Sequence, residues 1–418
     1  MSKSKRYGLL NRLSANILHG RLKSLEGGII TFVEGDQRKS FGSADDLEAE
    51  LRVHDPRFYR RSLLGGGVGF AEGFMLGWWS TDNLTALLRI FVRSMSLSNQ
   101  FEKGFALFAR KLLGLYQWRK KNTREGSRQN IFEHYDLGND FFSLFLDETL
   151  TYSCGLFNTP GMSIEDASVA KLERICELIS IKETDHVLEI GCGWGSFAIH
   201  AAKQHGCRVS AITISREQYD LARERVQREG LGDRVVVSFK DYREMEGTYD
   251  KLVSIEMIEA VGHEFLGDFF SKCESLLAED GAMALQGITM SEEFYEDYLR
   301  SADFIQRYIF PGSCCPALSA IKNAVSDSTD LELTGTENIG SHYATTLGKW
   351  RLRFIENIEK FRGMGHSEEF IRTWLYYFSY CEAGFAEDYL GNVQLVLQKP
   401  PRGKSPSPDV ARKELSKV

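Results

Sequence analysis

The stretch Asp185-His-Val-Leu-Glu-Ile-Gly-Cys-Gly-Trp-Gly195 decides the fold of this chain. Residues 186–190 are a short apolar run typical of a buried strand, and the alternating glycines after it predict a tight turn into a helix over 196–205. Because glycine has no side chain, such a turn lets backbone N–H groups approach a bound ligand. No Lys-Ser/Thr pair follows the glycines, which argues against a phosphate-binding P-loop. A tight turn without a ligand would show the same pattern, so this alternative stays open on the stretch alone.

Strand-like and helix-like segments alternate beyond this turn. We predict strands over 208–214, 234–240, 249–255, 281–288 and 392–398, and helices over 216–229 and 265–277. This alternation predicts an α/β fold with a doubly wound, Rossmann-like sheet. Ligands of such sheets bind outside the carboxyl ends of the strands, where the strand order reverses. The side chains expected at those ends are Glu189, Thr213, Tyr242 and those of Glu256 to Glu259.

The composition is that of an ordinary globular protein. Its 418 residues suffice for two domains with sizeable cores, and the net charge of −7 argues against a general nucleic-acid binder. The chain has no apolar run of about 18 residues, so we expect no transmembrane helix, and no signal-peptide pattern supports secretion. The eight cysteines include no C-x-x-C pair. We therefore expect reduced thiols in the cytoplasm, and neither a disulfide framework nor a metal site.

Changes in composition divide the chain into four segments. They are a small N-terminal α/β unit (1–118), a basic linker (119–129), the large α/β domain (130–398) and a disordered tail (399–418). Within the first unit we predict a helix over 9–22, a hairpin over 28–42 and a helical apolar periodicity over 84–118. The apolar periodicity is either core or a surface that meets lipid or the partner domain. The linker either rests on phospholipid headgroups or is simply solvated.

A series of further motifs gives the chain a family resemblance. In chain order they are Tyr135-Asp-Leu-Gly-Asn-Asp-Phe-Phe142, Leu150-Thr-Tyr-Ser-Cys-Gly155, Ser254-Ile-Glu-Met-Ile-Glu-Ala-Val-Gly262, Arg307-Tyr-Ile-Phe-Pro-Gly312 and His342-Tyr-Ala-Thr-Thr-Leu-Gly-Lys-Trp350. The G-x-G-x-G turn after Glu189 is similar to the first motif of class I S-adenosylmethionine-dependent methyltransferases. Together these motifs resemble the cyclopropane fatty acid synthase family, which includes the mycolic acid cyclopropane synthases. The N-terminal unit resembles the accessory domain of the longer, phospholipid-modifying members.

The resemblance implies an enzyme that uses S-adenosyl-L-methionine to transfer a methyl(ene) group to the cis double bond of an unsaturated phospholipid acyl chain. Methylation leaves a carbocation, and the family uses a bound bicarbonate ion as the base that closes the cyclopropane ring. The resemblance also implies a cytoplasmic, peripheral position on the inner face of the membrane, and it allows a homodimer. Two alternatives stay open: a fatty-acyl C-methyltransferase that makes branched chains, and a lipid- or adenosine-binding module without catalysis.

Matched motif by motif, the resemblance implies a cofactor site and an anion cage. The implied cofactor contacts are Tyr152, Ser153, Gly191, Gly193, Thr213, Gln218 and Tyr242. The implied catalytic set is Cys154, Glu259, Gln286, the backbone carbonyl of Ile288 and Tyr343, with Cys381 as a pocket wall. Three of these also have a purely structural interpretation: Cys154 as a small buried hydrophobe, Glu259 as an acid at a helix start, and Tyr343 as a core ring.

The chain departs from the family pattern at one cage position. Familiar members have a histidine where Leu285-Gln-Gly-Ile288 has Gln286, and glutamine cannot carry a proton at neutral pH. Gln286 either holds the anion with altered basicity or marks a branch that makes methyl- or methylene-branched chains. An aromatic-rich insertion over 290–331 could line an apolar channel that holds the acyl chain and stabilises its cation. Packing in the hydrophobic core is the alternative interpretation, and it explains most of these rings.

Overall fold

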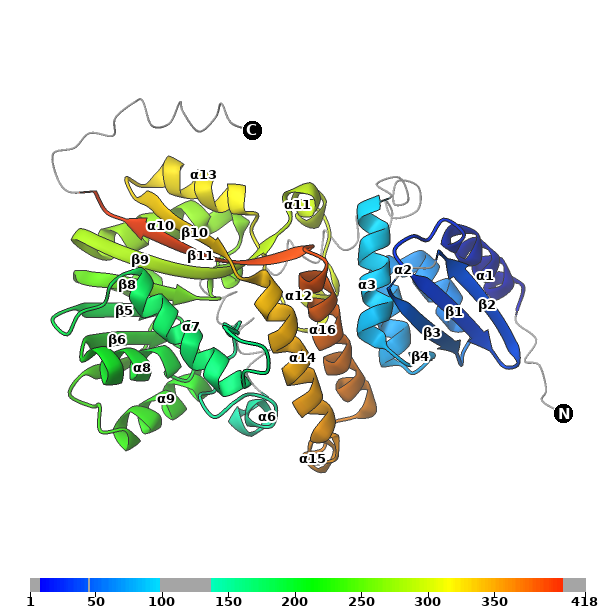
Figure 1. The fold of residues 1–418 in the computed structure, drawn as a ribbon, viewed down its shortest axis with the longest axis horizontal. Coiled ribbons are helices and arrows are strands. Elements are labelled where there is room, and N and C mark those ends of the chain that lie inside the picture. The colour runs from blue at the N-terminus through cyan, green and yellow to red at the C-terminus, as the bar shows by residue number, and fades with distance from the viewer. Residues whose placement is uncertain (1–7, 44–45, 98–136, 401–418) are drawn as a thin grey trace.

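A computed structural model describes residues 8–43, 46–97 and 137–400. The linker predicted over 119–129, the second half of the apolar periodicity and the tail beyond residue 400 lie outside the described residues. Figure 1 shows a small sheet and a large sheet with a group of helices between them. Among the helices described, none combines the length and apolarity that crossing a bilayer requires.

The smaller sheet has four strands in the order β2-β1-β3-β4. Its strands are β1 (Ile29–Glu34), β2 (Gln37–Gly42), β3 (Glu48–Val53) and β4 (Trp79–Thr81), and the helices around it are α1 (Leu9–Leu22), α2 (Arg57–Met75) and α3 (Leu84–Leu97). The sequence predicted the antiparallel hairpin of β1 and β2 and the bounds of α1, and both predictions are confirmed.

The larger sheet has seven strands in the order β10-β11-β9-β8-β5-β6-β7. They are β5 (His186–Ile190), β6 (Arg208–Thr213), β7 (Val235–Phe239), β8 (Tyr249–Ile255), β9 (Leu277–Met290), β10 (Glu332–Asn338) and β11 (Leu390–Gln398). The run from β7 to β9 is parallel, and β11 is antiparallel to both of its neighbours. Because β5 has β6 on one side and β8 on the other, the strand order reverses there. The predicted doubly wound α/β fold is confirmed.

Helices cover both faces of the larger sheet. The helices of the large unit, some of which lie between the two sheets, are α6 (Asn139–Ser143), α7 (Ile164–Leu178), α8 (Ser196–His205), α9 (Arg216–Arg228), α10 (Leu266–Leu276), α11 (Glu292–Tyr298), α12 (Phe304–Tyr308), α13 (Leu318–Ser328), α14 (Gly340–Glu356), α15 (Ile358–Gly363) and α16 (Glu368–Ala386), with 3-10 turns η1 (Tyr242–Glu244), η2 (Ile258–Ala260) and η3 (His263–Phe265). Successive strand residues point to opposite faces. Val187 accordingly packs in one core with α7 and α8, and Leu188 packs in another with α10 and α13.

Two strands differ from the sequence prediction. β9 begins at Leu277, directly after α10, whereas the predicted strand began at residue 281. The register between β8 and β9 shifts there, and Asp280 has a φ of 61°, which is the signature of a bulge rather than a strand start. β10 was not predicted, because its sequence Glu-Leu-Thr-Gly-Thr-Glu-Asn is polar. As an edge strand it is largely exposed and needs no apolar alternation.

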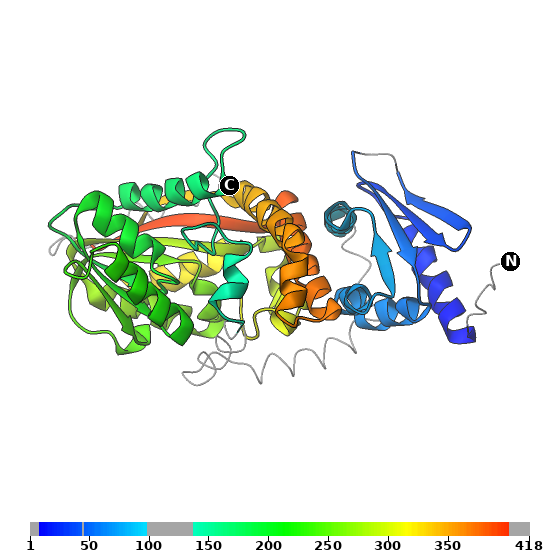
Figure 2. The ribbon, with the colours of Figure 1, turned by 90° about the horizontal axis from the view of Figure 1, so that it is seen from below.

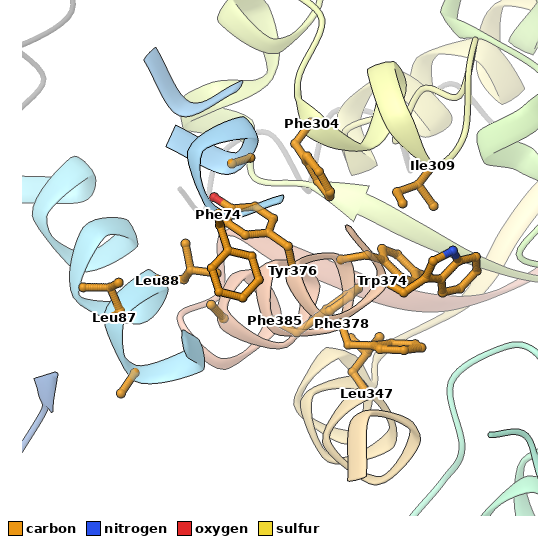
Figure 3. Packing of buried hydrophobic residues seen from close by; sticks show 14 of the residues in the cluster. Phe74, Leu87, Leu88, Phe304, Ile309, Leu347, Trp374, Tyr376, Phe378 and Phe385 are labelled. Atoms are coloured by element: carbon orange, nitrogen blue, oxygen red, sulfur yellow. The ribbon is translucent and has the colours of Figure 1, made fainter. Parts of the chain in front are cut away.

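The helix α16 joins the small and large units into one hydrophobic core. Figure 3 shows Phe74 of α2 and Leu88 of α3 on one side of α16, with Phe304 of α12 close by. The ring of Tyr376 lies 5.9 Å from that of Phe74 and 4.7 Å from that of Phe304. Most rings of the aromatic insertion therefore serve core packing, and the described part of the 84–118 periodicity meets α16.

Charged contacts reinforce this junction. The carboxylate of Glu387, just after α16, accepts hydrogen bonds from Nε of Arg89 at 2.6 Å and from Nε of Arg93 at 2.7 Å. Both arginines belong to α3, so a single carboxylate after α16 binds that helix at two positions. Figure 2 shows α3 and α2 facing α16 from the N-terminal side, with α1 on the far edge of the small unit.

Candidate active site

The glycine turn after β5 lies where the strand order reverses. Gly191, Gly193 and Gly195 have φ values of 82°, 52° and 85°, a left-handed conformation that glycine adopts without strain. The N–H of Gly191 donates to the carbonyl of Ile212 at 3.0 Å, which ties the turn to β6. A Cβ at Gly191 would meet Met257 at 2.8 Å, whereas one at Gly193 would meet none of the described residues within 4 Å. Gly193 therefore leaves space for a ligand against the backbone.

A second group of predicted cofactor residues follows β6. Thr213 and Gln218 are buried, and Oγ1 of Thr213 donates to Oε1 of Gln218 at 2.8 Å. Ser215 caps α9, since its Oγ accepts from the N–H of Gln218 at 3.3 Å. Tyr242 follows β7 in η1 and packs edge-to-face on Phe269, with ring centroids 5.3 Å apart. Burial raises the pKa of Tyr242 to about 12. These side chains lie at the carboxyl ends of neighbouring strands, as expected for a nucleoside site.

The remaining predicted cofactor residues, Tyr152 and Ser153, precede α7. The hydroxyl groups of Tyr152 and Tyr377 are 2.9 Å apart. Oγ of Ser153 accepts a hydrogen bond of 2.9 Å from Nζ of Lys171, which is only 1% exposed. Sequence reasoning missed Lys171, because a lysine on an amphipathic helix normally faces water.

The buried ammonium of Lys171 balances buried acids beneath the turn. Desolvation lowers the pKa of Lys171, and its electrostatic interactions with the acidic groups of Glu256, Cys154, Glu189 and Asp147 oppose that shift. Glu189 lies just before the glycine turn and is only 3% exposed. Burial raises its pKa to about 8, and the nearby Lys171 opposes part of this rise. In the described part of the chain, Oε2 of Glu189 has no hydrogen-bond partner. An unpaired polar atom below the glycine turn fits a site for a polar ligand.

The carboxylate of Glu256 lies among the residues predicted to form an anion cage. Its Oε1 accepts from the backbone N–H of Cys154 at 2.9 Å, from Nε2 of Gln286 at 2.9 Å and from Nδ2 of Asn392 at 2.7 Å. Its Oε2 accepts from the hydroxyl of Tyr343 at 2.6 Å. Four donors from separate parts of the chain thus hold one carboxylate in place.

The backbone of Glu256 explains how its side chain reaches the cage. Glu256 is the first residue after β8, and its φ of 49° is left-handed, which costs a non-glycine residue about 1 kcal/mol. Its N–H donates to the carbonyl of Gln286 at 2.7 Å, which holds this conformation. The sequence placed Glu256 at the strand end but assigned the cage role to Glu259. Only the local backbone turn decides which of the two carboxylates points at Cys154 and Tyr343.

Glu259 lies beside the cage and is differently bonded. Its Oε1 accepts from the backbone N–H of Ile288, so Ile288 contributes its N–H to Glu259, whereas the sequence analysis assigned its carbonyl to an anion. Within the described residues, Oε2 of Glu259 is buried without a partner. Burial raises the pKa of Glu259 to about 8, with a further contribution from the negative charge of Glu256. Glu259 is therefore mostly protonated at neutral pH.

Two cysteines of the predicted set occupy different places. Cys154 is fully buried, and burial raises the pKa of its thiol well above the ordinary value. Its Sγ lies 3.3 Å from the carbonyl of Gly155, and its backbone N–H is the group that meets Glu256. Cys381 is on α16 and is not among the partners of the Glu256 carboxylate. Its assignment as a pocket wall stays a prediction.

The cage residues do not fit a bound bicarbonate ion. The groups expected around that anion, on Cys154, Gln286 and Tyr343, all donate to Glu256. A bicarbonate would have to displace this carboxylate or share its donors, and two anions in one partly buried site repel each other.

The reversal point, the glycine turn and the polar side chains at neighbouring strand ends define a methyltransferase of the class I fold. The family model of mycolic acid cyclopropane synthetase matches residues 121–395. The tuberculostearic acid methyltransferase UfaA1 of Mycobacterium tuberculosis is 37% identical over 372 residues, which is 86% of this chain and 86% of that protein. The cyclopropane-fatty-acyl-phospholipid synthase of Escherichia coli K12 is 34% identical, over 84% of this chain and 88% of that protein.

Among solved structures, the mycolic acid cyclopropane synthase CmaA1 in complex with SAH and CTAB has a TM-score of 0.62 and 29% identity. That similarity covers 65% of this chain and 98% of CmaA1. The chain belongs to the mycolic acid cyclopropane synthetase family and is an S-adenosylmethionine-dependent methyltransferase of the cyclopropane-fatty-acyl-phospholipid synthase type.

Proposed function

We propose that this enzyme methylates the cis double bond of an unsaturated acyl chain in a membrane phospholipid. The name of the E. coli relative, with its acyl-phospholipid substrate, supports this substrate class. S-adenosylmethionine supplies an electrophilic methyl group when bound. The residues that would hold it are the predicted contacts in the glycine turn, after β6 and β7 and before α7: Tyr152, Ser153, Gly191, Gly193, Thr213, Gln218 and Tyr242. An alkene is a poor nucleophile, so these residues must hold the donor close to the double bond and exclude water.

The observation that carries the mechanism is the Glu256 carboxylate in its ring of donors. Bond formation between the methyl carbon and one alkene carbon leaves a positive charge on the other alkene carbon. A fixed carboxylate stabilises that charge, because its dipolar surroundings are already arranged. Oε2 of Glu256 accepts the Tyr343 hydroxyl, and a carboxylate oxygen has a second lone pair. We assign Glu256 as the group that accepts the proton from the cation.

Whether a hydride migrates before the methyl group loses its proton decides the product. Loss of a proton from the transferred methyl group closes a cyclopropane ring, which is the first candidate product. Migration of a hydride to the cationic carbon, followed by loss of a proton from the methyl group, gives a methylene branch. A saturated methyl branch would need a separate reductant.

One observation favours the branched chain as a second candidate. Glu256 accepts hydrogen bonds from Gln286 and Tyr343, where the family resemblance implies a bicarbonate ion and a histidine. With Glu256 as the proposed base, a different group faces the cation. The 37%-identical relative is named as a methyltransferase and not as a cyclopropane synthase, which supports this candidate.

The test is incubation of the full chain with 13C-methyl S-adenosylmethionine and vesicles of a cis-unsaturated phospholipid, followed by NMR of the released fatty acids. High-field ring protons identify the cyclopropane, and exomethylene protons identify the branch. Because both products have the same mass, mass spectrometry alone does not separate them. If no 13C enters the acyl chains, the proposed function is wrong and the non-catalytic binding module gains support.

We also propose that the enzyme works as a peripheral protein at the inner face of the membrane. Support comes from α1, where Leu9, Leu10, Leu13 and Ile17 are exposed by 76%, 64%, 51% and 47%. Leu9, Leu13 and Ile17 follow one another at helical spacing, so they form one apolar row. Co-sedimentation with anionic vesicles tests it: the variant Leu9→Ser/Leu13→Ser should remain in the supernatant, and equal sedimentation would contradict this role. The homodimer remains a prediction, tested by light scattering.

A further inference from the structure

Three candidate metal ligands and a neighbouring carboxylate meet between two helices outside the methyl-transfer site. Glu173 and Cys176 are on α7, and His200 and His205 are on α8. We call them the α7–α8 cluster. A thiol sulfur of Cys176 and ring nitrogens of the two histidines all lie within 4.8 Å of one another. The Glu173 carboxylate lies 2.8 Å from Nε2 of His200 and 3.3 Å from Nε2 of His205.

The fold holds these side chains in place. Glu173 and Cys176 are three residues apart on one helix, so they share a face. His205 is the last residue of α8, and the chain turns away at Gly206, which has a φ of 72°. Cys176 is buried, while the side chains of His200, His205 and Glu173 are 11%, 21% and 40% exposed. Cys176 is therefore the buried end of the cluster, and ions can reach the cluster from solvent on the side of His205 and Glu173.

The donor set and spacing fit a zinc-like ion. Thiolate, imidazole and carboxylate are the three ligand types of protein zinc sites. With metal–ligand bonds of about 2.0–2.3 Å, the ligand atoms of a tetrahedral site are separated by about 3.5 Å. The carboxylate–imidazole separations are already close to that value. The sulfur lies within 4.8 Å of the imidazole nitrogens, so a side-chain rotation must bring it closer to them by up to about 1.3 Å.

We propose that the α7–α8 cluster binds one divalent transition-metal ion of the zinc class. Cys176, His200 and His205 supply sulfur and nitrogen ligands, and Glu173 supplies the fourth. The site fastens α7, which carries Lys171, to α8, which starts at the glycine turn. It is independent of the methyl-transfer chemistry. The lack of a C-x-x-C pair predicts no metal site, whereas these ligands come from two helices.

The test uses the full chain, treated with a chelator and then titrated with Co2+. We expect one equivalent to bind, with the sulfur-to-cobalt charge-transfer absorption and the intense visible bands of a tetrahedral site, and Zn2+ to displace it. The midpoint of thermal unfolding should rise with Zn2+, since a ligand that binds the folded state stabilises it.

Variants separate this site from unspecific binding. Cys176→Ala should abolish the charge-transfer band, and His205→Ala should weaken binding about tenfold or more, because each removes one ligand. Cys273→Ala, which removes a buried thiol of α10 in the core on the other sheet face, is the matched control and should bind as the parent does. If Cys176→Ala fails to fold, His205→Ala at the helix end decides the matter. Absence of stoichiometric binding, or binding that both folded variants retain, would overturn the proposal and leave Glu173 as a metal-free bridge between two histidines.

Discussion

The hydroxyl of Tyr343 donates a 2.6 Å hydrogen bond to Oε2 of Glu256, joining α14 to the end of β8. The ring of Tyr343 is stacked on Phe385 of α16 at 4.5 Å. One tyrosine thus connects the shared hydrophobic core to Glu256, the carboxylate that we propose accepts the proton from the cation. Burial raises the pKa of the Tyr343 hydroxyl well above its ordinary value, so it acts as a hydrogen-bond donor at neutral pH.

Replacement of that carboxylate should separate chemistry from cofactor binding. In Glu256→Gln the amide has neither the charge nor the proton affinity of the carboxylate, so we expect methyl transfer to slow by about 10²-fold or more. Affinity for S-adenosylmethionine, measured by calorimetry, should stay within about threefold, because the predicted cofactor contacts are on other residues. Glu259→Gln is the matched control and should change the rate much less at neutral pH, since Glu259 is mostly protonated there. A larger loss of rate in Glu259→Gln than in Glu256→Gln would instead assign the role of the base to Glu259.

The ammonium of Lys171 should set the pH at which the site works. Lys171→Met removes the positive charge that lowers the pKa of Glu189. A carboxylate that loses a nearby cation is protonated at higher pH, so the acidic limb of the pH–rate profile should move to higher pH. Lys203→Met, which removes an exposed lysine paired with Glu229 on the surface, should leave the profile unchanged. A uniform drop in rate without a shift of the limb would assign Lys171 a purely structural role.

The buried acid Glu189 should make stability depend on pH. Its pKa is about 8 in the folded chain, against an ordinary 4.5, so the folded state holds a proton that the unfolded state has lost. The stabilisation is complete below pH 4.5 and is lost as the pH rises to about 8. Glu189→Gln cannot ionise, so the free energy of unfolding of the parent should fall relative to this variant between about pH 5 and about pH 8. Denaturant unfolding at both pH values measures it, and a constant difference would refute the buried, uncharged carboxyl.

Gly193 should be required for the cofactor and not only for the turn. Gly193→Ala and Gly230→Ala both place a Cβ at positive φ with none of the described residues within 4 Å, so both should lose about 1 kcal/mol of stability. Gly230 ends α9, outside the set of predicted cofactor contacts, and is the control for backbone strain. Only Gly193→Ala should weaken S-adenosylmethionine binding in calorimetry. Equal affinities for the two variants would remove Gly193 from the cofactor site.

The sequence predicted those features that depend on local pattern. The strand over 186–190 and the helix over 196–205 have the bounds expected, because an apolar run, spaced glycines and a helical segment each act over a few residues. The polar edge strand β10 escaped prediction, since pairing with β11 rather than apolar alternation makes it a strand.

The cage shows a different limit. The family motifs implied one site for Cys154, Gln286 and Tyr343, and all three donate to one carboxylate. That carboxylate belongs to Glu256, and its position depends on the left-handed backbone of this residue. The inward position of Lys171 and the approach of Cys176 to His205 likewise follow from how helices pack on the sheet. Such contacts between distant segments leave no periodic signal in the chain.

The central claim is that the Glu256 carboxylate acts where the family resemblance implies a bicarbonate ion. The most direct measurement is the rate of methyl transfer in carefully degassed, bicarbonate-free buffer, before and after bicarbonate is added back. We predict the same rate in both conditions. A rate that collapses without bicarbonate and returns on its addition would contradict the assignment of Glu256.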